Sequence, residues 1–414
     1  NLSTFLKKKD SKIKICFIGS HVQALPKETL EKEKSIDFVF TNEGVYALRN
    51  ILNLKSFESE YLKKINGIAF RDKESVILNP SEKVVPTSRM DFDLPGYAWD
   101  LLPFKNKPLD MYRAHFWHAG FNHNKRSPFA AIYTSLGCQF ACSFCMINIV
   151  NRVNNNDNID ASHSRGMRFW SPEWVKKELK KLANLGVKTL RISDEMFFLN
   201  RKYYKPILED IVKNQFDFNM WAYSRIDTVR KDMLDIFKKA GVNWIALGVE
   251  AGNQVVRQEV SKGSFQEINI REVCKSIQDN DINIISNYIF GFPEDNLDTM
   301  NETLDLALEL NTETANMYPC QALPGSPLYT KAVIEGLDLP KTYNEFAFLS
   351  YESKPLSTNF LSSKEVLKFR DYAWNKYFTN EKYLNLVEKK FGIQERQNVI
   401  DMSKIKLKRK LLGD

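Results

Sequence analysis

The sequence lacks any apolar run long enough for a helix that crosses a bilayer, which takes about 20 apolar residues. The N-terminal stretch NLSTFLKKKD also has no apolar core behind its lysines, which a secretory signal needs. Cysteine is scarce, because the 414 residues include only six, and Cys16, Cys274 and Cys320 stand far from any other. Such usage argues against a disulfide framework and suits a reducing compartment. We therefore expect a cytoplasmic protein without a transmembrane segment.

Charge of one sign is not concentrated either. The net charge of +8 is spread along the chain, with short basic runs only at Lys7 to Lys9 and in the C-terminal KIKLKRK. Runs of this kind are typical of solvated faces and tails, so we do not expect nucleic acid as a partner. The first residue is Asn and not Met, which suggests an N-terminally incomplete piece of a longer protein.

Between about 130 and 320 the sequence alternates short β-branched apolar runs with amphipathic stretches, a pattern that predicts parallel strands connected by helices. Strands are expected at 130–135, 188–193, 218–223, 243–249, 283–290 and 314–319, and helices at 171–186, 201–214, 229–240, 266–280 and 296–310. Six such units suit a partial (β/α)6 barrel of the TIM type better than a closed eight-fold one.

The N-terminal segment predicts a second α/β element. Residues 12–19 and 37–42 resemble buried parallel strands, and 67–80 resembles a hairpin that turns at Lys73 and Glu74. Two parallel strands cannot bury both faces alone, so this segment is expected to be part of a Rossmann-like domain. The expected domains are a partial Rossmann-like domain (1–95), a proline-rich linker (96–128), the barrel (129–330) and a helical extension with a basic tail (331–414).

Three cysteines are packed into one short loop after the first expected barrel strand, in the stretch GCQFACSFC. Structural zinc usually takes four ligands; Cys138, Cys142 and Cys145 supply three, and His163 could be the fourth, so a zinc site stays open. Three thiolates can instead hold three corners of a 4Fe-4S cluster and leave one iron open to another ligand.

This spacing, CxxxCxxC with Phe144 just before the third cysteine, resembles that of the radical SAM superfamily. The resemblance implies that the open iron binds S-adenosylmethionine. It also implies that one electron, from a donor of the flavodoxin or ferredoxin type, cleaves this cofactor to a 5'-deoxyadenosyl radical that abstracts hydrogen from a small-molecule substrate. No catalytic residue beyond the cofactor ligands is predicted.

Segments after the later strands resemble the superfamily's S-adenosylmethionine contacts. Ser193, Asp194 and Glu195 stand where the family binds the methionine amino group, although its usual two glycines are missing. The other implied contacts are Arg225 for the carboxylate, Glu250 for the ribose, and Ile289, Gly291 and Glu294 for the adenine. Simpler roles stay open: the two acids could cap a helix, the arginine could form a salt bridge, and the glycine could serve a turn.

The N-terminal segment resembles the later half of a cobalamin-binding domain, with Asn42, Glu43, Gly44 and Val45 in place of the usual Gly-Glu-Gly-Glu. The DxHxxG motif of the earlier half is absent, and DASHSRG (160–166) differs from it in spacing. The C-terminal stretch resembles the helical tail of cobalamin-type members. Resemblance to this cobalamin-binding subfamily implies cobalamin-dependent C-methylation, or a related rearrangement or cyclisation.

Three alternatives stay open. One is a radical enzyme that uses only S-adenosylmethionine, and another is a tRNA methylthiotransferase, although that family carries three further N-terminal cysteines where this chain has only Cys16. The third is a non-catalytic protein that binds zinc or nucleic acid. His115, His118 and His123 in the linker and Cys320 after the last strand are either substrate contacts or ordinary packing residues.

Overall fold

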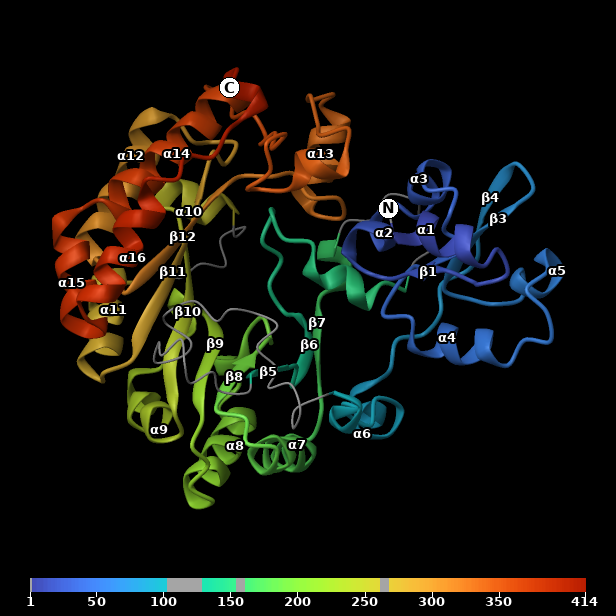
Figure 1. Cartoon of the computed structure of the whole chain (residues 1–414), viewed down its shortest axis with the longest axis horizontal. Coiled ribbons are helices and arrows are strands. Elements are labelled where there is room, and N and C mark those ends of the chain that lie inside the picture. Colours follow the sequence, from blue (N-terminus) through green and yellow to red (C-terminus); the bar gives the residue numbers. More distant parts are fainter. Residues whose placement is uncertain (1, 103–128, 154–160, 261–267) are drawn as a thin grey trace. The chain divides into compact units, whose positions relative to one another are not determined.

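The computed structural model describes residues 2–102, 129–153, 161–260 and 268–414 (Figure 1). The chain divides into two compact units, each of which we describe by itself. Unit 1 comprises Asn1–Pro95, Leu136–Phe169 and Ala322–Leu337, and unit 2 comprises Gly96–Ser135, Trp170–Gln321 and Asp338–Asp414. Within the described ranges, no helix is both long enough and apolar enough to span a membrane.

Unit 2 is built on one sheet of six parallel strands in the order β12-β11-β10-β9-β8-β5. The strands are β5 (Phe129–Ile132), β8 (Thr189–Ile192), β9 (Asn219–Arg225), β10 (Val242–Glu250), β11 (Asn283–Phe290) and β12 (Thr314–Pro319). All six expected strands are present, and β11 and β12 have the expected bounds. The predicted α/β fold with a partial six-stranded barrel is confirmed.

Helices follow the strands as the sequence pattern predicts, except that the helix at Gln254–Val260 was not predicted. They are α7 (Pro172–Asn184), α8 (Arg201–Lys213), α9 (Leu234–Lys239), α10 (Gln254–Val260), α11 (Ile270–Asp279) and α12 (Leu297–Leu310), followed by the C-terminal α14 (Ser363–Phe378), α15 (Glu381–Phe391) and α16 (Ile393–Ser403). Helix α7 begins as expected, because Ser171 accepts a hydrogen bond from the Trp174 amide. Helix α9 is shorter than expected, because residues 231–233 form a 3-10 turn before it.

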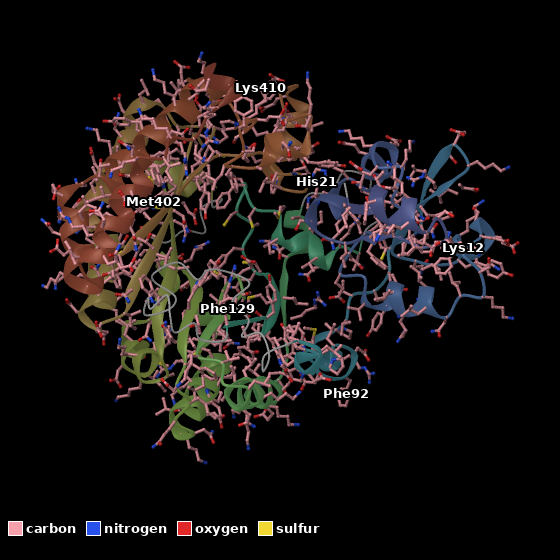
Figure 2. The ribbon with its side chains drawn as sticks, viewed as in Figure 1. Lys12, His21, Phe92, Phe129, Met402 and Lys410 are labelled. Atoms are coloured by element: carbon pink, nitrogen blue, oxygen red, sulfur yellow. The ribbon has the colours of Figure 1, made fainter. Side chains whose placement is uncertain are left out.

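The two faces of this sheet have different surroundings. Tyr288 and Phe290 are fully buried on the face that the helices cover, and the Phe290 ring lies 5.5 Å from that of Phe369 in α14. Alternate residues of the strands point to the inner face, where Trp244, Ala246 and Ile285 pack with aromatic side chains of β9. The side chains are drawn in Figure 2.

Unit 1 contains a four-stranded sheet in the order β1-β2-β3-β4. Its strands are β1 (Cys16–Phe17), β2 (Phe38–Phe40), β3 (Ile68–Asp72) and β4 (Ser75–Leu78), and its N-terminal helices are α1 (Leu2–Lys9), α2 (Ser20–Ala24), α3 (Pro26–Lys32), α4 (Val45–Leu52), α5 (Ser59–Leu62) and α6 (Met90–Asp93). As predicted, β1 pairs with β2 in parallel, and β3 and β4 form a hairpin that turns at Lys73 and Glu74. The prediction that the first strand is buried is wrong. Phe17 is 42% exposed, because β1 is the edge of the sheet in the described part of the chain.

The segment with the three cysteines also begins differently from the prediction. Strand β5 ends at Ile132, and a separate strand, β6 (Ser135–Cys138), pairs with β7 (Gly166–Phe169) in a two-stranded sheet. The cysteine loop therefore follows β6 and not the first barrel strand. The chain leaves the barrel sheet where the Asp194 carboxylate accepts the Thr134 amide. Residues 322–337 of the same unit contain α13 (Pro327–Ile334), which was not predicted.

Arg409 anchors the basic C-terminal tail, which was expected to be solvated. Its side chain is fully buried. Nε and Nη2 donate to the two oxygens of Asp371 at 2.9 and 3.0 Å, and Nη1 donates to the carbonyls of Phe348 and Ser350. The tail is thus fixed to α14 of unit 2 by a bidentate ion pair.

We predict that Arg409→Met lowers the free energy of unfolding by about 3 kcal/mol, because it leaves the Asp371 carboxylate and two carbonyls without their donor. The matched control is Lys408→Met, since Lys408 is exposed. Denaturant unfolding of both variants checks this. Equal stability of the two would contradict the role given to Arg409.

Candidate functional site

The three cysteines lie in one loop of unit 1. Cys138 is buried at the end of β6, whereas Cys142 and Cys145 are half-buried in a turn in which the Cys145 amide donates to the Cys142 carbonyl at 3.1 Å. The Asn148 side chain accepts from the Cys138 amide at 2.7 Å and donates to the Phe140 carbonyl at 3.1 Å. One amide side chain therefore holds both ends of the loop's first turn. Sequence reasoning missed this residue.

Only glycine fits immediately before the first cysteine. Gly137 has a φ of +82°, and a Cβ there would lie 2.3 Å from the Gly166 carbonyl oxygen and 2.5 Å from Asn151 Nδ2. Asn151 in turn donates to the Gly166 carbonyl at 2.9 Å. The base of the cysteine loop is thus packed tightly against β7 and Asn151.

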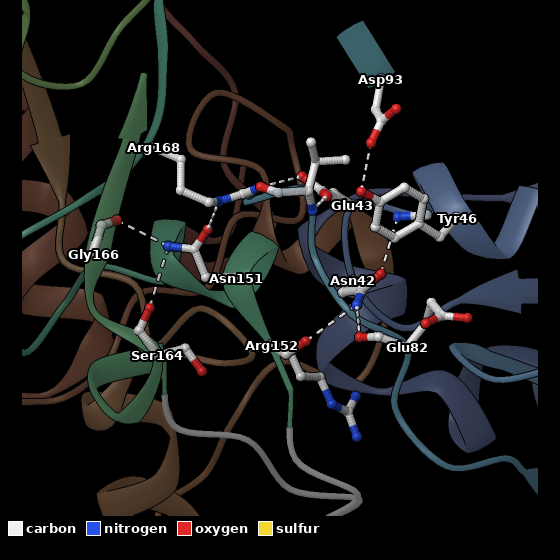
Figure 3. A network of polar contacts seen from close by, with 12 residues as sticks. Asn42, Glu43, Tyr46, Glu82, Asp93, Asn151, Arg152, Ser164, Gly166 and Arg168 are labelled. Atoms are coloured by element: carbon white, nitrogen blue, oxygen red, sulfur yellow. Dashed lines mark hydrogen bonds and ion pairs between the residues drawn. The ribbon is translucent and has the colours of Figure 1, made fainter. Parts of the chain in front are cut away.

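A buried ion pair connects this base to the N-terminal sheet, within the same unit (Figure 3). Arg168 donates from Nε to Asn151 Oδ1 at 3.0 Å and from Nη1 to Glu43 Oε2 at 2.7 Å, and the two charged side chains are 10% and 5% exposed. Beside them, Asn42 donates to the carbonyls of Arg152 and Glu82 at 3.2 and 2.8 Å. Asn42 and Glu43, which the sequence placed at a cobalamin motif, thus hold the segment that carries the cysteines.

The donor set of this loop fits an iron-sulfur cluster by its chemistry, because three soft sulfur ligands lie within one short loop. No disulfide joins any of the six cysteines, all of which lie in the described ranges. Among the described residues, no three His, Cys, Asp or Glu side chains converge as ready metal ligands, and His163 is exposed. Phe144 is half-buried in the loop.

In unit 2, Asp194 joins the ends of two strands. Its carboxylate accepts from the amide and the hydroxyl of Thr134, both at 2.6 Å, and from the Ser135 hydroxyl at 2.5 Å. Burial raises its pKa to about 6 although these hydrogen bonds oppose the shift. The neighbouring Ser193 is buried, and Glu195 is half-buried with a pKa raised to about 7 by burial and by the Asp194 charge. Asp194 is therefore engaged with the residues that follow β5, and among the described residues Glu195 is the carboxylate of the pair that accepts no hydrogen bond.

Arg225 and Glu250 lie at the carboxyl ends of β9 and β10. Arg225 donates from Nε to Asp227 Oδ1 at 2.7 Å and forms a second bond to the other oxygen of Asp227, a partner that sequence reasoning missed. Glu250 has a φ of +68°, and its carboxylate lies over Gly248, where a Cβ would be 2.5 Å from Oε1. Burial raises the Glu250 pKa to about 7, while the Arg225 charge opposes the shift.

Close packing explains the glycine in the loop after β11. Gly291 has a φ of +88°, and a Cβ there would lie 2.3 Å from Val366 Cγ1 in α14. The Asp295 carboxylate accepts from the Gly291 amide at 3.0 Å and from that of the next residue at 2.9 Å. Ile289 and Glu294 are half-buried on either side. Glycine is thus required here even without a ligand, and Asp295 is a further residue that the sequence did not reveal.

Unit 2 therefore brings the expected S-adenosylmethionine contacts to one edge of its sheet, since the carboxyl ends of parallel strands lie together. The cysteines belong to unit 1. His115, His118 and His123 lie outside the described residues. Cys320 is buried, which raises its thiol pKa well above the usual range, and its amide donates to the Phe290 carbonyl at 2.7 Å.

We predict a pH-dependent stability difference for Glu250→Gln. The pKa of Glu250 rises from 4.5 to about 7 on folding, so wild type loses stability as pH increases from 4.5 through 7. The neutral amide of the variant does not titrate, so the free energy of unfolding of the variant relative to wild type should rise by about 3 kcal/mol between pH 4.5 and 8. Denaturant unfolding measures this, with Glu259→Gln on an exposed site of α10 as the control. A difference independent of pH would contradict the burial of this carboxylate.

Comparison with known proteins shows which proteins this chain is similar to. Residues 132–307 match the profile described as the Radical SAM superfamily. An uncharacterized methyltransferase, PH0819 of Pyrococcus horikoshii, is 23% identical over 88% of this chain and 72% of its own length. The anaerobic magnesium-protoporphyrin IX monomethyl ester cyclase of Cereibacter sphaeroides is 25% identical over 81% of this chain. The chain spans only about half (51%) of that cyclase.

The fold also matches a solved structure. The radical S-adenosylmethionine methyltransferase TsrM from Kitasatospora setae, with cobalamin and a [4Fe-4S] cluster bound, has a TM-score of 0.64 at 13% identity. The match covers 97% of this chain and 83% of that one. The segment 132–307, which contains the cysteine loop and the carboxyl ends of β8 to β11, is therefore similar to the radical SAM superfamily.

Proposed function

We propose that this chain is a radical SAM enzyme acting on a small-molecule substrate, in which Cys138, Cys142 and Cys145 hold a 4Fe-4S cluster. The observation that carries the proposal is the three-cysteine loop within the matched segment 132–307. When bound, the cluster supplies the electron that cleaves S-adenosylmethionine to a 5'-deoxyadenosyl radical, which abstracts hydrogen from the substrate.

The residues of unit 2 have distinct parts in this proposal. The Glu250 carboxylate, which ionises near neutral pH, would accept hydrogen bonds from the ribose hydroxyls. Glu195 would accept from the methionine amino group, because the Asp194 oxygens already have three donors on Thr134 and Ser135. Arg225 would bind the methionine carboxylate while Asp227 fixes its guanidinium plane.

We predict that Cys142→Ala abolishes both cluster assembly and cleavage of S-adenosylmethionine, whereas wild type assembles about four irons per chain after anaerobic reconstitution. Cys16→Ala is the matched control, because Cys16 is exposed on β1. Iron content and release of 5'-deoxyadenosine are the measurements. A Cys142 variant that still cleaves the cofactor would refute the proposal, and one tightly bound zinc without cleavage would favour the non-catalytic alternative.

We further propose that the reaction is a cobalamin-dependent C-methylation or a related cyclisation. The methyltransferase and cyclase names of the relatives and the TsrM likeness support this proposal. In unit 1, Gly19 follows the parallel strand β1, and a Cβ there would meet no atom of the described residues within 4 Å. Ligands of doubly wound sheets bind at such carboxyl ends. The engagement of Asn42 and Glu43 with residues 152–168 favours the second candidate, an enzyme that uses S-adenosylmethionine alone.

Retention of cobalamin separates the two candidates. We expect the reconstituted chain to keep about one equivalent of hydroxocobalamin through gel filtration, since the cofactor would carry the methyl group. The visible spectrum of the protein fraction is the measurement, and a parallel assay follows 5'-deoxyadenosine. A chain that cleaves S-adenosylmethionine but keeps no cobalamin would establish the second candidate.

The electron for cleavage is proposed to come from a reductant of the flavodoxin or ferredoxin type. The cytoplasmic location expected from the cysteine usage stays a prediction.

A further inference from the structure

Arg191 presents a cation on the inner face of the unit 2 sheet. Its register partner on β9 is Trp221, so the two side chains point to the same face. The guanidinium carbon lies 4.7 Å from the Trp221 ring centroid and 5.2 Å from that of Tyr223, and Nη2 donates to the Tyr223 hydroxyl at 2.6 Å. Two aromatic rings therefore fix the position of this charge.

The charge has no carboxylate partner within 4.0 Å among the residues that the structure describes. Its Nε is buried and has no hydrogen-bond acceptor within the described part of the chain. Three buried arginines elsewhere in the chain are paired with acids: Arg168 with Glu43, Arg225 with Asp227, and Arg409 with Asp371. A half-buried cation with an unused donor is costly for the folded chain, and an anionic ligand would remove that cost.

The surroundings suit an organic ligand with one negative charge. Trp221 and Tyr223 are half-buried, and the fully buried Trp244, Ala246 and Ile285 continue the same face as an apolar layer. The charge of Glu195 acts on Tyr223, and burial raises the Tyr223 pKa to about 12, so this phenol stays protonated at neutral pH. The face therefore combines apolar and aromatic area with one cation.

We propose that Arg191 binds a carboxylate of the substrate and that the apolar or aromatic body of the substrate packs on Trp221 and Tyr223. The proposal rests on the proposed function, because it names the substrate class of that enzyme. A guanidinium matches a planar carboxylate through two N–H groups, and Nε supplies one of them. A phosphate dianion fits less well, because Arg191 is a single cation and the negative charge of Glu195 already acts on the neighbouring Tyr223.

Binding of two isosteric probes to the full-length reconstituted chain tests this assignment. Calorimetry compares 1-naphthoate with its uncharged amide, 1-naphthamide, and we expect the acid to bind at least about tenfold more tightly, since a hydrogen bond to a charged group is worth that much. Arg191→Met should abolish the preference by weakening the acid alone, and Arg191→Lys should restore part of it. Arg271→Met is the matched control, because Arg271 lies exposed on α11 and pairs with Glu309.

Two further variants keep the assignment testable if Arg191→Met is unstable. Tyr223→Phe retains the cation and should leave the preference for the acid within about threefold of wild type. Trp221→Leu should weaken acid and amide equally, because it removes only stacking area.

Equal affinity of wild type for the two probes, no binding of either, or an unchanged preference in Arg191→Met overturns the proposal. Tighter binding of 1-naphthyl phosphate than of 1-naphthoate overturns the carboxylate assignment. Because the probes need neither cluster assembly nor cleavage of S-adenosylmethionine, a failure here is distinguishable from a failure of the proposed function.

Discussion

The buried carboxylate of Asp194 is the constraint on which the site edge of unit 2 depends. An isolated carboxylate at this depth would be too costly to stay ionised, but three donors from Thr134 and Ser135 offset much of that cost. The same contacts end β5 and direct the chain into β6, whose last residue is Cys138. Tyr203 of α8 also donates to the Thr134 carbonyl at 2.7 Å. One side chain thus determines where the barrel sheet stops and where the cysteine segment begins.

Charge placement distinguishes structural residues from residues available to ligands. Arg168, Arg225 and Arg409 are buried and paired with acids, so their donors stabilise the folded chain before any ligand arrives. Arg191 and Glu250 are different, because among the described residues Arg191 bonds to a tyrosine hydroxyl and to no carboxylate, and burial raises the pKa of Glu250 to about 7. Burial of such a group costs free energy in the free protein, and a ligand that pairs with the group can remove this cost.

Sequence periodicity predicted strands well where both faces are buried. The strands β11 and β12 have the expected bounds, because their alternating burial between helices and the inner face leaves a clear apolar pattern. The exposed edge of β1 could not be predicted in this way, since an edge position depends on which strands pair and not on the residues of the strand. The order of the motifs along the sequence also predicted that Arg225 and Gly291 lie at strand ends. It could not reveal Asp227, Asp295 or Asn148, whose roles come from distances of about 3 Å.

A residue can keep its position in a sequence motif and have a different structural role. Glu43 stands at the end of β2, where the cobalamin resemblance placed it, yet its carboxylate binds Arg168, which binds Asn151 at the base of the cysteine loop. Since Gly137 leaves no room for a Cβ beside Asn151, any shift of this chain of contacts would move the first cysteine. In unit 1 the residues expected to serve one cofactor therefore support the loop proposed to hold another. Their partners, and not their order in the sequence, determine what they do.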